Sequence, residues 1–173
     1  LAVRLGDVGI HKWPVVVIDD QVPEVNFIAP PKNMGRGLLS LQYEANDDYG
    51  LSGLRMVVSH GQGWSLPNGE NYSAFPLPVP KLTEAFGKGR GTRDFSGHPW
   101  AGVEAKVSLV ATDGLGQEDS TDKVAIVLPE RIFNHPVARG LIAARKMLNR
   151  PGENAITEAV FTLEKIAKRP QHF

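Results

Sequence analysis

Acidic side chains flank several stretches of this sequence that are expected to be β-strands. Asp47 and Asp48 follow one stretch in which apolar and polar residues alternate, Asp113 follows another, and Asp20 lies at a Pro-containing break before a third. Proteins bind Ca²⁺ through about six to eight oxygen atoms from carboxylates, carbonyls and water. If these positions lie at one pole of the fold, Asp20, Asp113 and either Asp47 or Asp48 can bind one Ca²⁺ ion.

An ordinary structural role competes with this calcium hypothesis. Asp19, Glu44 and Asn46 extend the same acidic clusters. Asp and Asn commonly form turns, because their side chains accept hydrogen bonds from their own backbone. The turn interpretation is favoured for each of these residues taken singly, so the calcium site depends on their convergence in space.

The stretch Phe86–Gly91 combines glycines with Lys88 and Arg90, as phosphate-binding loops do. A P-loop, however, requires Gly, four residues and then Gly-Lys-Ser/Thr at the start of a helix. Here Gly89 follows Lys88, and Thr92–Ser96 is expected to be a short strand. The sequence therefore favours a flexible, solvated basic loop over a nucleotide site.

No catalytic motif stands out among the remaining side chains. Ser59, His60 and His98 could serve a hydrolase, but the sequence has no Gly-x-Ser-x-Gly nucleophile elbow. The five His residues also lack the His-Glu-x-x-His spacing of a zinc protease. Catalysis is therefore the least favoured class of function.

The three Trp residues allow a carbohydrate-binding platform, since aromatic rings can stack on sugars. They are Trp13, Trp64 and Trp100. Large aromatic side chains more often belong to a hydrophobic core. Trp100 in particular is expected to close one end of that core.

The strongest strand signals are the stretches Leu39–Ala45, Leu54–Val58 and Val103–Ala111, in which apolar residues alternate with their neighbours. Weaker strands are expected at Val25–Phe27, ended by Pro30 and Pro31, and at Asp122–Leu128. The prolines in Ala74–Pro80 restrict that stretch to an edge strand or a crossing segment. About seven short strands separated by turns predict an immunoglobulin-like antiparallel β-sandwich of Greek-key type, with a barrel as the alternative.

The two ends of the chain depart from this pattern. The β-branched run Trp13–Ile18 predicts a strand, and the acidic stretch after it resembles a joint between domains. Residues 1–20 are therefore either a remnant of a preceding domain or additional strands of a sandwich that spans 21–129. Residues 130–173 are expected to be helical: Asn134 caps the first helix, Pro136 lies in its first turn, and Glu153 or Asn154 starts the second helix.

Charge and composition exclude several classes of function. The 173 residues contain 19 basic and 19 acidic side chains, and this zero net charge argues against a nucleic-acid-binding protein. The absence of Cys excludes disulfides and thiolate metal sites. No apolar run approaches the roughly 20 residues that span a bilayer. Because the sequence starts at Leu1 rather than Met, we expect it to be part of a longer protein.

Several motifs between Trp13 and Met147 resemble a known family. They are Asp20–Val25, Leu41–Leu51 with its Asp-Asp-Tyr-Gly run, Phe95–Gly102 with His-Pro-Trp-Ala-Gly, Ala111–Asp113 and Leu128–Arg131. These motifs are similar to the core of a bacterial family called domain of unknown function 4175, although its members often have Pro-Pro in place of Val22-Pro23. The resemblance implies a large envelope protein, with transmembrane helices near its N-terminus and a long region outside the cytoplasm. It implies no catalytic residue.

We therefore expect a non-catalytic structural or interaction module of a membrane-anchored envelope protein. Its expected location is periplasmic, with anchoring to the inner membrane through segments outside this sequence. The expected partner is another protein or a neighbouring domain of the same chain, contacted through edge strands or the amphipathic helices. The alternative is a calcium-dependent or carbohydrate-binding sandwich, and no cofactor other than Ca²⁺ is expected.

Overall fold

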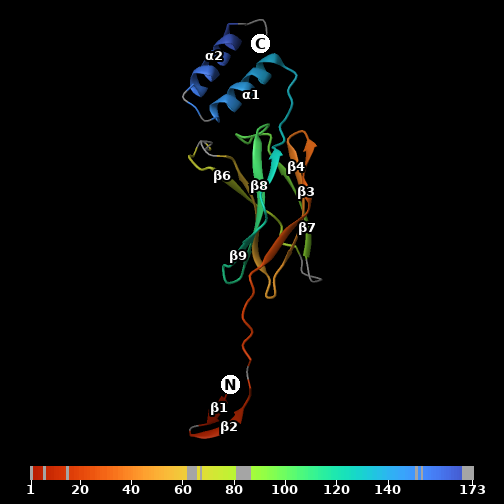
Figure 1. Ribbon diagram of the computed structural model, residues 1–173, viewed down its shortest axis with the longest axis vertical. Coiled ribbons are helices and arrows are strands. Elements are labelled where there is room, and N and C mark those ends of the chain that lie inside the picture. Colours follow the sequence, from red (N-terminus) through yellow and green to blue (C-terminus); the bar gives the residue numbers. More distant parts are fainter. Residues whose placement is uncertain are drawn as a thin grey trace.

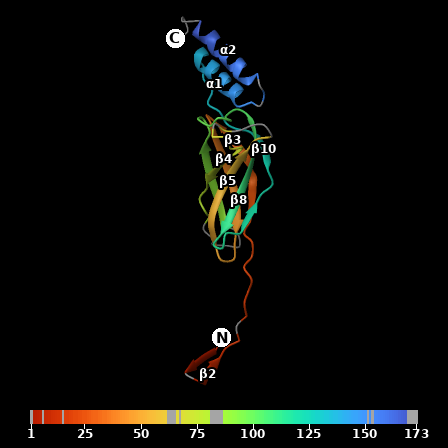
Figure 2. The same ribbon diagram turned by 90° about the vertical axis from the view of Figure 1, so that its left-hand side faces the viewer.

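The molecule is elongated, with an N-terminal hairpin, a β-sandwich and a pair of helices following one another along its long axis (Figure 1). A perpendicular view shows the same order, with the hairpin and the helices at opposite ends (Figure 2). The computed structural model describes residues 2–5, 7–14, 16–61, 66, 68–80, 87–150, 152 and 154–168.

Two antiparallel sheets form the sandwich, which confirms the predicted fold class. The first sheet has the order β3-β4-β7, and the second has the order β10-β8-β5-β6, with β9 also pairing with β8. The strands are β3 (Glu24–Gly35), β4 (Leu38–Asn46), β5 (Leu51–Ser59), β6 (Tyr72–Pro76), β7 (Gly87–Asp94), β8 (Glu104–Asp113), β9 (Glu118–Ser120) and β10 (Val124–Val127). A constant-type immunoglobulin domain pairs its fourth strand with the fifth. Here the fourth strand of the sandwich, β6, pairs with β5 instead.

The core lies between the inner faces of the two sheets. Alternate residues of β4, β5 and β8 point into it, as period-two patterning requires. The buried side chains of these strands are Leu39, Leu41, Tyr43, Ala45, Leu54, Met56, Val58, Ala105, Val107, Leu109 and Ala111. Trp100 is fully buried beside them, so the expectation that it closes one end of the core is confirmed.

Strand β3 continues where the sequence predicts an end. Pro30 and Pro31 lie inside it, and the pairing register with β4 shifts between Ala29 and Lys32. Proline cannot donate to a ladder, but an edge strand with an irregular register tolerates it. Because β3 is the edge of its sheet, the two prolines interrupt the pairing locally without ending the strand.

The predicted strand over Trp13–Ile18 is absent from the described part of that run, where Trp13, Pro14 and residues 16–18 have no regular structure. The N-terminal strands are β1 (Ala2–Leu5) and β2 (Val8–Lys12), which pair with each other. Val16 and Val17 are 84% and 82% exposed. β-propensity reflects packing on neighbouring strands. Among the described residues, 16–23 pair with no strand and form an extended linker (Figure 1).

The predicted basic loop over Phe86–Gly91 is instead strand β7, although Phe86 itself lies outside the described residues. Gly89 and Gly91 lie on its inner face, where the side chains of Tyr43 and Leu77 leave no room for a Cβ atom. A Cβ atom on Gly89 would lie 2.3 Å from Tyr43 Cε2, and one on Gly91 would lie 2.9 Å from Leu77 Cδ2. The Tyr43 hydroxyl donates a hydrogen bond to the Pro78 carbonyl at 2.8 Å. The glycine spacing therefore serves packing rather than phosphate binding.

The predicted helical pair is present as α1 (Pro136–Leu148) and α2 (Ala155–Ala167). Pro136 occupies the first turn as predicted, but the N-cap position of α1 is His135 rather than Asn134. Asn154 precedes α2 as predicted, and Glu153 lies outside the described residues. The helices approach closely at Gly140, where a Cβ atom would lie 2.3 Å from Ile166 Cδ1.

Replacing Gly89 by Ala tests the role of glycine in β7. The added methyl group would overlap the Tyr43 ring, so we expect a loss of about 1–3 kcal/mol in the free energy of unfolding, measured by urea denaturation. The control is Gly53→Ala in β5, where the nearest atom, Thr112 Cβ, lies at 4.0 Å. Equal effects of the two substitutions would contradict this account of the glycine pattern.

Candidate functional site

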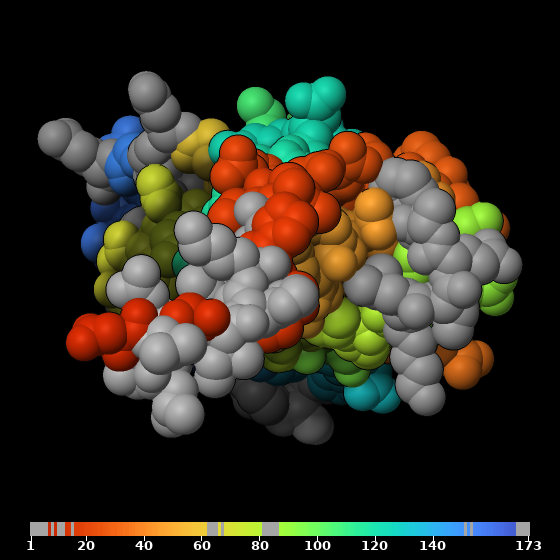
Figure 3. Space-filling view, turned by 90° about the horizontal axis from the view of Figure 1, so that it is seen from below, coloured from red at the N-terminus to blue at the C-terminus, as the bar shows by residue number. Residues whose placement is uncertain are grey.

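Three of the predicted calcium-binding residues lie around one cavity at the pole of the sandwich nearest the linker. Asp47 follows β4 of the first sheet, Asp113 ends β8 of the second, and Asp20 lies in the linker. They line a cavity of about 400 Å³ together with Ile18, Tyr49, Gly50, Gly114 and Leu115. Figure 3 looks at the molecule from this end, with N-terminal residues in front in red. The fold thus brings together positions 93 residues apart in the chain, from Asp20 to Asp113.

Each of the three carboxylates has one oxygen atom bound by the protein and one without a protein hydrogen-bond donor. Asp47 Oδ2 accepts from the backbone N–H groups of Tyr49 and Gly50, at 3.1 and 2.6 Å. Asp113 Oδ1 accepts from the backbone N–H groups of residues 115 and 117, both at 2.8 Å. Asp20 Oδ2 accepts from Gln117 Nε2 at 2.8 Å. The other oxygen of each group is buried and unpaired.

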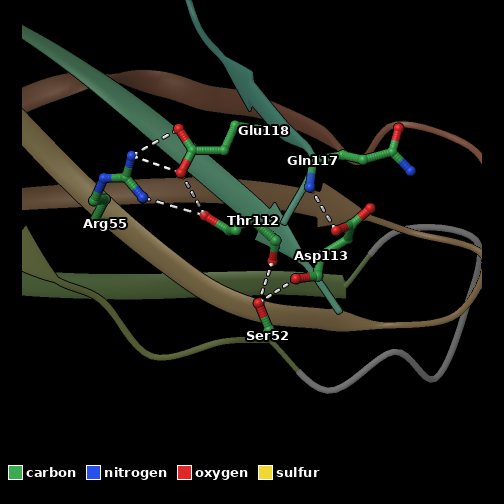
Figure 4. Close-up of polar contacts among 6 residues, drawn as sticks. All are labelled: Ser52, Arg55, Thr112, Asp113, Gln117 and Glu118. Carbon is green, nitrogen blue, oxygen red and sulfur yellow. Dashed lines mark hydrogen bonds and ion pairs between the residues drawn. The ribbon is translucent and has the colours of Figure 1, made fainter. Parts of the chain in front are cut away.

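The surroundings of Asp113 fix its position (Figure 4). Ser52 of β5 donates its hydroxyl hydrogen to the backbone carbonyls of Thr112 and Asp113. On the same surface, Arg55 forms an ion pair with Glu118 at 2.9 Å and donates a hydrogen bond to Thr112. The hydrogen bond from Arg55 is the main cause that lowers the pKa of Glu118. Strands β5, β8 and β9 are thereby tied together beside the acidic cavity.

The remaining acidic candidates lie outside the lining of the cavity. Asp48 and Asp19 are exposed, Glu44 is in β4 opposite Lys88, and Asn46 ends β4 opposite Glu24. Sequence reasoning missed Gln117, which joins the cluster by donating its backbone N–H to Asp113 and its side chain to Asp20. No sequence signal marks that role, because the two partners meet only through the fold.

The negative charges of the cluster affect the linker carboxylate. Desolvation raises the pKa of Asp20, the hydrogen bond from Gln117 lowers it, and the charges of Asp48, Asp113 and Asp47 raise it further, so that the pKa lies above its ordinary value. In the part of the chain that the structure describes, no three His, Cys, Asp or Glu side chains stand ready to hold one metal ion. The carboxylates are therefore grouped around the cavity but are not at ligand distance from a common point.

The opposite pole of the sandwich holds the helices. Arg145 of α1 donates to the backbone carbonyls of Ser96 and Ala101, at 3.4 and 3.2 Å. Asn149, which caps α1, donates to the Pro99 carbonyl at 3.2 Å. Lys146 forms an ion pair with Glu130 at 2.7 Å. The loop with the His-Pro-Trp-Ala-Gly motif is thus the platform on which α1 docks, a role that the sequence analysis did not predict.

His98 lies beneath this platform and contacts Ser73, a pair that resembles part of a hydrolase site. The Trp100 backbone N–H donates to His98 Nδ1 at 3.2 Å, so Nε2 of the neutral ring carries the hydrogen. In this tautomer Nε2 donates to Ser73 Oγ, 3.0 Å away. A nucleophilic serine needs the reverse arrangement, with a third group orienting the base. The His98 ring packs edge-on against the rings of Phe75, Phe95 and Trp100.

The Trp residues do not form a common platform in the described structure. Trp100 is fully buried and Trp13 is half exposed in the linker. Trp64 lies outside the described residues. The packing of Trp100 leaves no face of its ring for a sugar.

The fold and its two poles define a class of protein: an antiparallel β-sandwich that carries a docked helical pair at one end and a linker with a hairpin at the other. The chain belongs to the family described as Domain of unknown function (DUF4175), whose family model matches residues 1–173. No curated protein matches this sequence.

The environment of His98 predicts a specific pH dependence of stability. Burial, and then the charge of Arg145, lower the pKa of His98 from 6.5 to about 4. The unfolded chain therefore binds more protons than the folded one between these values, and stability falls as the pH is lowered through this window.

Between about pH 7.5 and pH 4.5 we expect the free energy of unfolding of the wild type, measured in urea, to fall by about 2 kcal/mol more than that of His98→Gln. His135→Gln, at an exposed position, is the control and should follow the wild type. Parallel curves for the wild type and His98→Gln would contradict the assignment of a neutral, buried His98.

Proposed function

We propose that this chain is a non-catalytic structural and interaction module of a larger, membrane-anchored envelope protein. Its sandwich acts as a spacer that presents the helical pair at a fixed orientation on one pole. The observation that carries the proposal is the attachment of α1 to the sandwich end. Arg145 and Asn149 donate to backbone carbonyls of the Ser96–Gly102 loop, and Lys146 pairs with Glu130. Charged hydrogen bonds to backbone carbonyls are directional, so they define an orientation and not merely a contact.

The helices also carry the surface best suited to binding a partner. Only Ala144 and Ala159 of this pair are buried. The exposed apolar side chains are Leu141, Leu148, Ile156, Val160, Phe161 and Leu163. Large exposed apolar surfaces commonly mark sites of protein–protein contact. The partner is proposed to be another protein or a neighbouring domain of the same chain.

The free edge of β7 is less suited to that purpose. Its outward side chains include Lys88 and Arg90, which are exposed. Charged side chains on an edge strand oppose the addition of another strand. The helical pair is therefore favoured over strand addition at β7 as the contact surface.

The location and anchoring of the protein rest on the family resemblance. In the described residues no helix is long and apolar enough to cross a membrane. We propose that this module lies outside the cytoplasm and that anchoring comes from segments beyond this sequence.

A pair of reporter fusions tests the proposed location. Alkaline phosphatase and green fluorescent protein are each joined after Lys168 in the full-length protein and expressed in a Gram-negative bacterium. Alkaline phosphatase requires an oxidising compartment for its disulfides, so we expect phosphatase activity and no fluorescence. Fluorescence without phosphatase activity would place the module in the cytoplasm and overturn this part of the proposal.

Replacing Arg145 by Ala tests the attachment of the helices. The substitution leaves two backbone carbonyls without their charged donor, so we expect the free energy of unfolding to fall by about 1–3 kcal/mol. Amide hydrogen exchange should show faster exchange in α1 and α2, with β5 and β8 unchanged. Arg139→Ala, at an exposed position of the same helix, is the control and should change neither measurement. Unchanged exchange in Arg145→Ala would show that the helices do not depend on this attachment.

A further inference from the structure

We propose that Asp20, Asp47 and Asp113 bind a Ca²⁺ ion, which holds the linker against both sheets of the sandwich. The inference is independent of the proposed interaction role. It concerns the pole opposite the helices, where the three carboxylates line one cavity.

The first support is the burial of unpaired carboxylate oxygens. Asp113 is only 2% exposed and Asp47 only 8%, yet Asp113 Oδ2 and Asp47 Oδ1 have no hydrogen-bond donor from the protein. Asp20 Oδ1 is also buried and has no hydrogen-bond donor from the protein. A buried carboxylate that lacks a partner is strongly unfavourable. The Asx-type hydrogen bonds of Asp47 and Asp113 explain one oxygen of each group and leave the other unexplained.

The second support is the charge of the cavity lining. Among the described residues, the lining includes three carboxylates and no Lys, Arg or His side chain. Arg55, on the same surface, is already paired with Glu118. One proton would satisfy one of the unpaired oxygens and leave the others exposed to mutual repulsion. A divalent cation between Asp47 and Asp113 would offset this charge, and Asp20 can join it only when the linker shifts, since the three carboxylates do not already converge on one point.

The ligand types favour Ca²⁺ over other cations. Zn²⁺ prefers His and Cys, and Mg²⁺ demands a nearly ideal octahedral shell. The cavity offers carboxylates, and they do not already converge on one point. Ca²⁺ tolerates irregular shells that water completes. Asp20 lies in a linker without regular structure, so it can move toward an ion held by Asp47 and Asp113.

Binding there would couple the hairpin to the sandwich. Asp47 follows the first sheet, Asp113 ends a strand of the second, and Asp20 lies between the hairpin and β3. In the structure the linker side of this pole is held by the hydrogen bond from Gln117 to Asp20 and by one from the Val25 backbone to Asp119. An ion would add a strong contact that limits the directions available to the linker.

Calorimetric titration with CaCl₂ and thermal unfolding in Ca²⁺ or chelator test the site directly. At a hundredfold excess over Kd we expect Ca²⁺ to raise the Tm by about 5–10 °C, with a much smaller rise in equimolar Mg²⁺. Asp113→Asn, Asp47→Asn and Asp20→Asn should each weaken the affinity at least about tenfold, since each removes a charged ligand. Asp20→Asn lies in the linker, so its effect does not depend on the stability of the sandwich.

Asp48→Asn is the matched control. Asp48 adjoins Asp47 and carries the same charge, but it is exposed and does not line the cavity. Its substitution should change the affinity less than about threefold. Absence of any Ca²⁺ effect on the wild type would overturn the proposal and leave protons or water to pair these oxygens. An equal loss of affinity in Asp48→Asn and Asp113→Asn would also overturn it, because it would indicate diffuse attraction rather than ligation.

A distance measurement tests the coupling of the linker. The chain has no Cys, so spin labels can be placed at Asp7→Cys in the hairpin turn and Asp122→Cys on the sandwich. Pulsed electron paramagnetic resonance should show a broad distance distribution in chelator and a narrower one in Ca²⁺. A distribution that stays unchanged when calorimetry detects binding would disprove the linker part of the proposal.

Discussion

The structure depends on the burial of two alternating strand faces against each other. The inner side chains of β4 meet those of β5 and β8, and a slip of one residue in any of these strands would turn its apolar set toward water. This constraint fixes the register of the sheets. It therefore also fixes where each strand ends, which decides what the loops at the two poles can do.

At one pole the register places Asp47 and Asp113 on facing sheets around a common cavity. Both residues form turns in the ordinary way, with their own backbone as donor. Turn formation does not explain the second carboxylate oxygen of Asp47 and of Asp113, which is buried without a donor. It also does not explain why Asp20 of the linker lines the same cavity. The turn interpretation and the calcium hypothesis are thus not exclusive, because they concern different oxygen atoms of the same side chains.

At the other pole the same register places the loop before β8 beneath α1. Trp100 and His98 fill the end of the core, and the carbonyls of that loop bind Arg145 and Asn149. The same short loop therefore both fills the end of the core and binds α1. The low pKa of His98 follows from the same placement, since burial and the neighbouring Arg145 both disfavour the charged ring.

The sequence by itself determined the elements whose patterning matches their own periodicity. The alternation in Leu39–Ala45 and Val103–Ala111 defined strands and core residues, and Pro136 and Asn154 marked where helices begin. The secondary structure predicted from the sequence was wrong where local propensity competed with tertiary packing. The run from 13 to 18 favours a strand, yet its described residues 16–18 pair with no described strand. The glycine-rich stretch of β7, in contrast, resembles a loop until the Tyr43 ring is packed against it.

Only the tertiary structure decided which distant side chains meet. Asp20, Asp47 and Asp113 were candidates from composition and position, but Gln117, Arg145 and the pairing of Ser73 with His98 had no local signal. The physical reason is that hydrogen bonds and charges act over a few ångströms in space, whereas sequence patterns report only the periodicity of burial along one element.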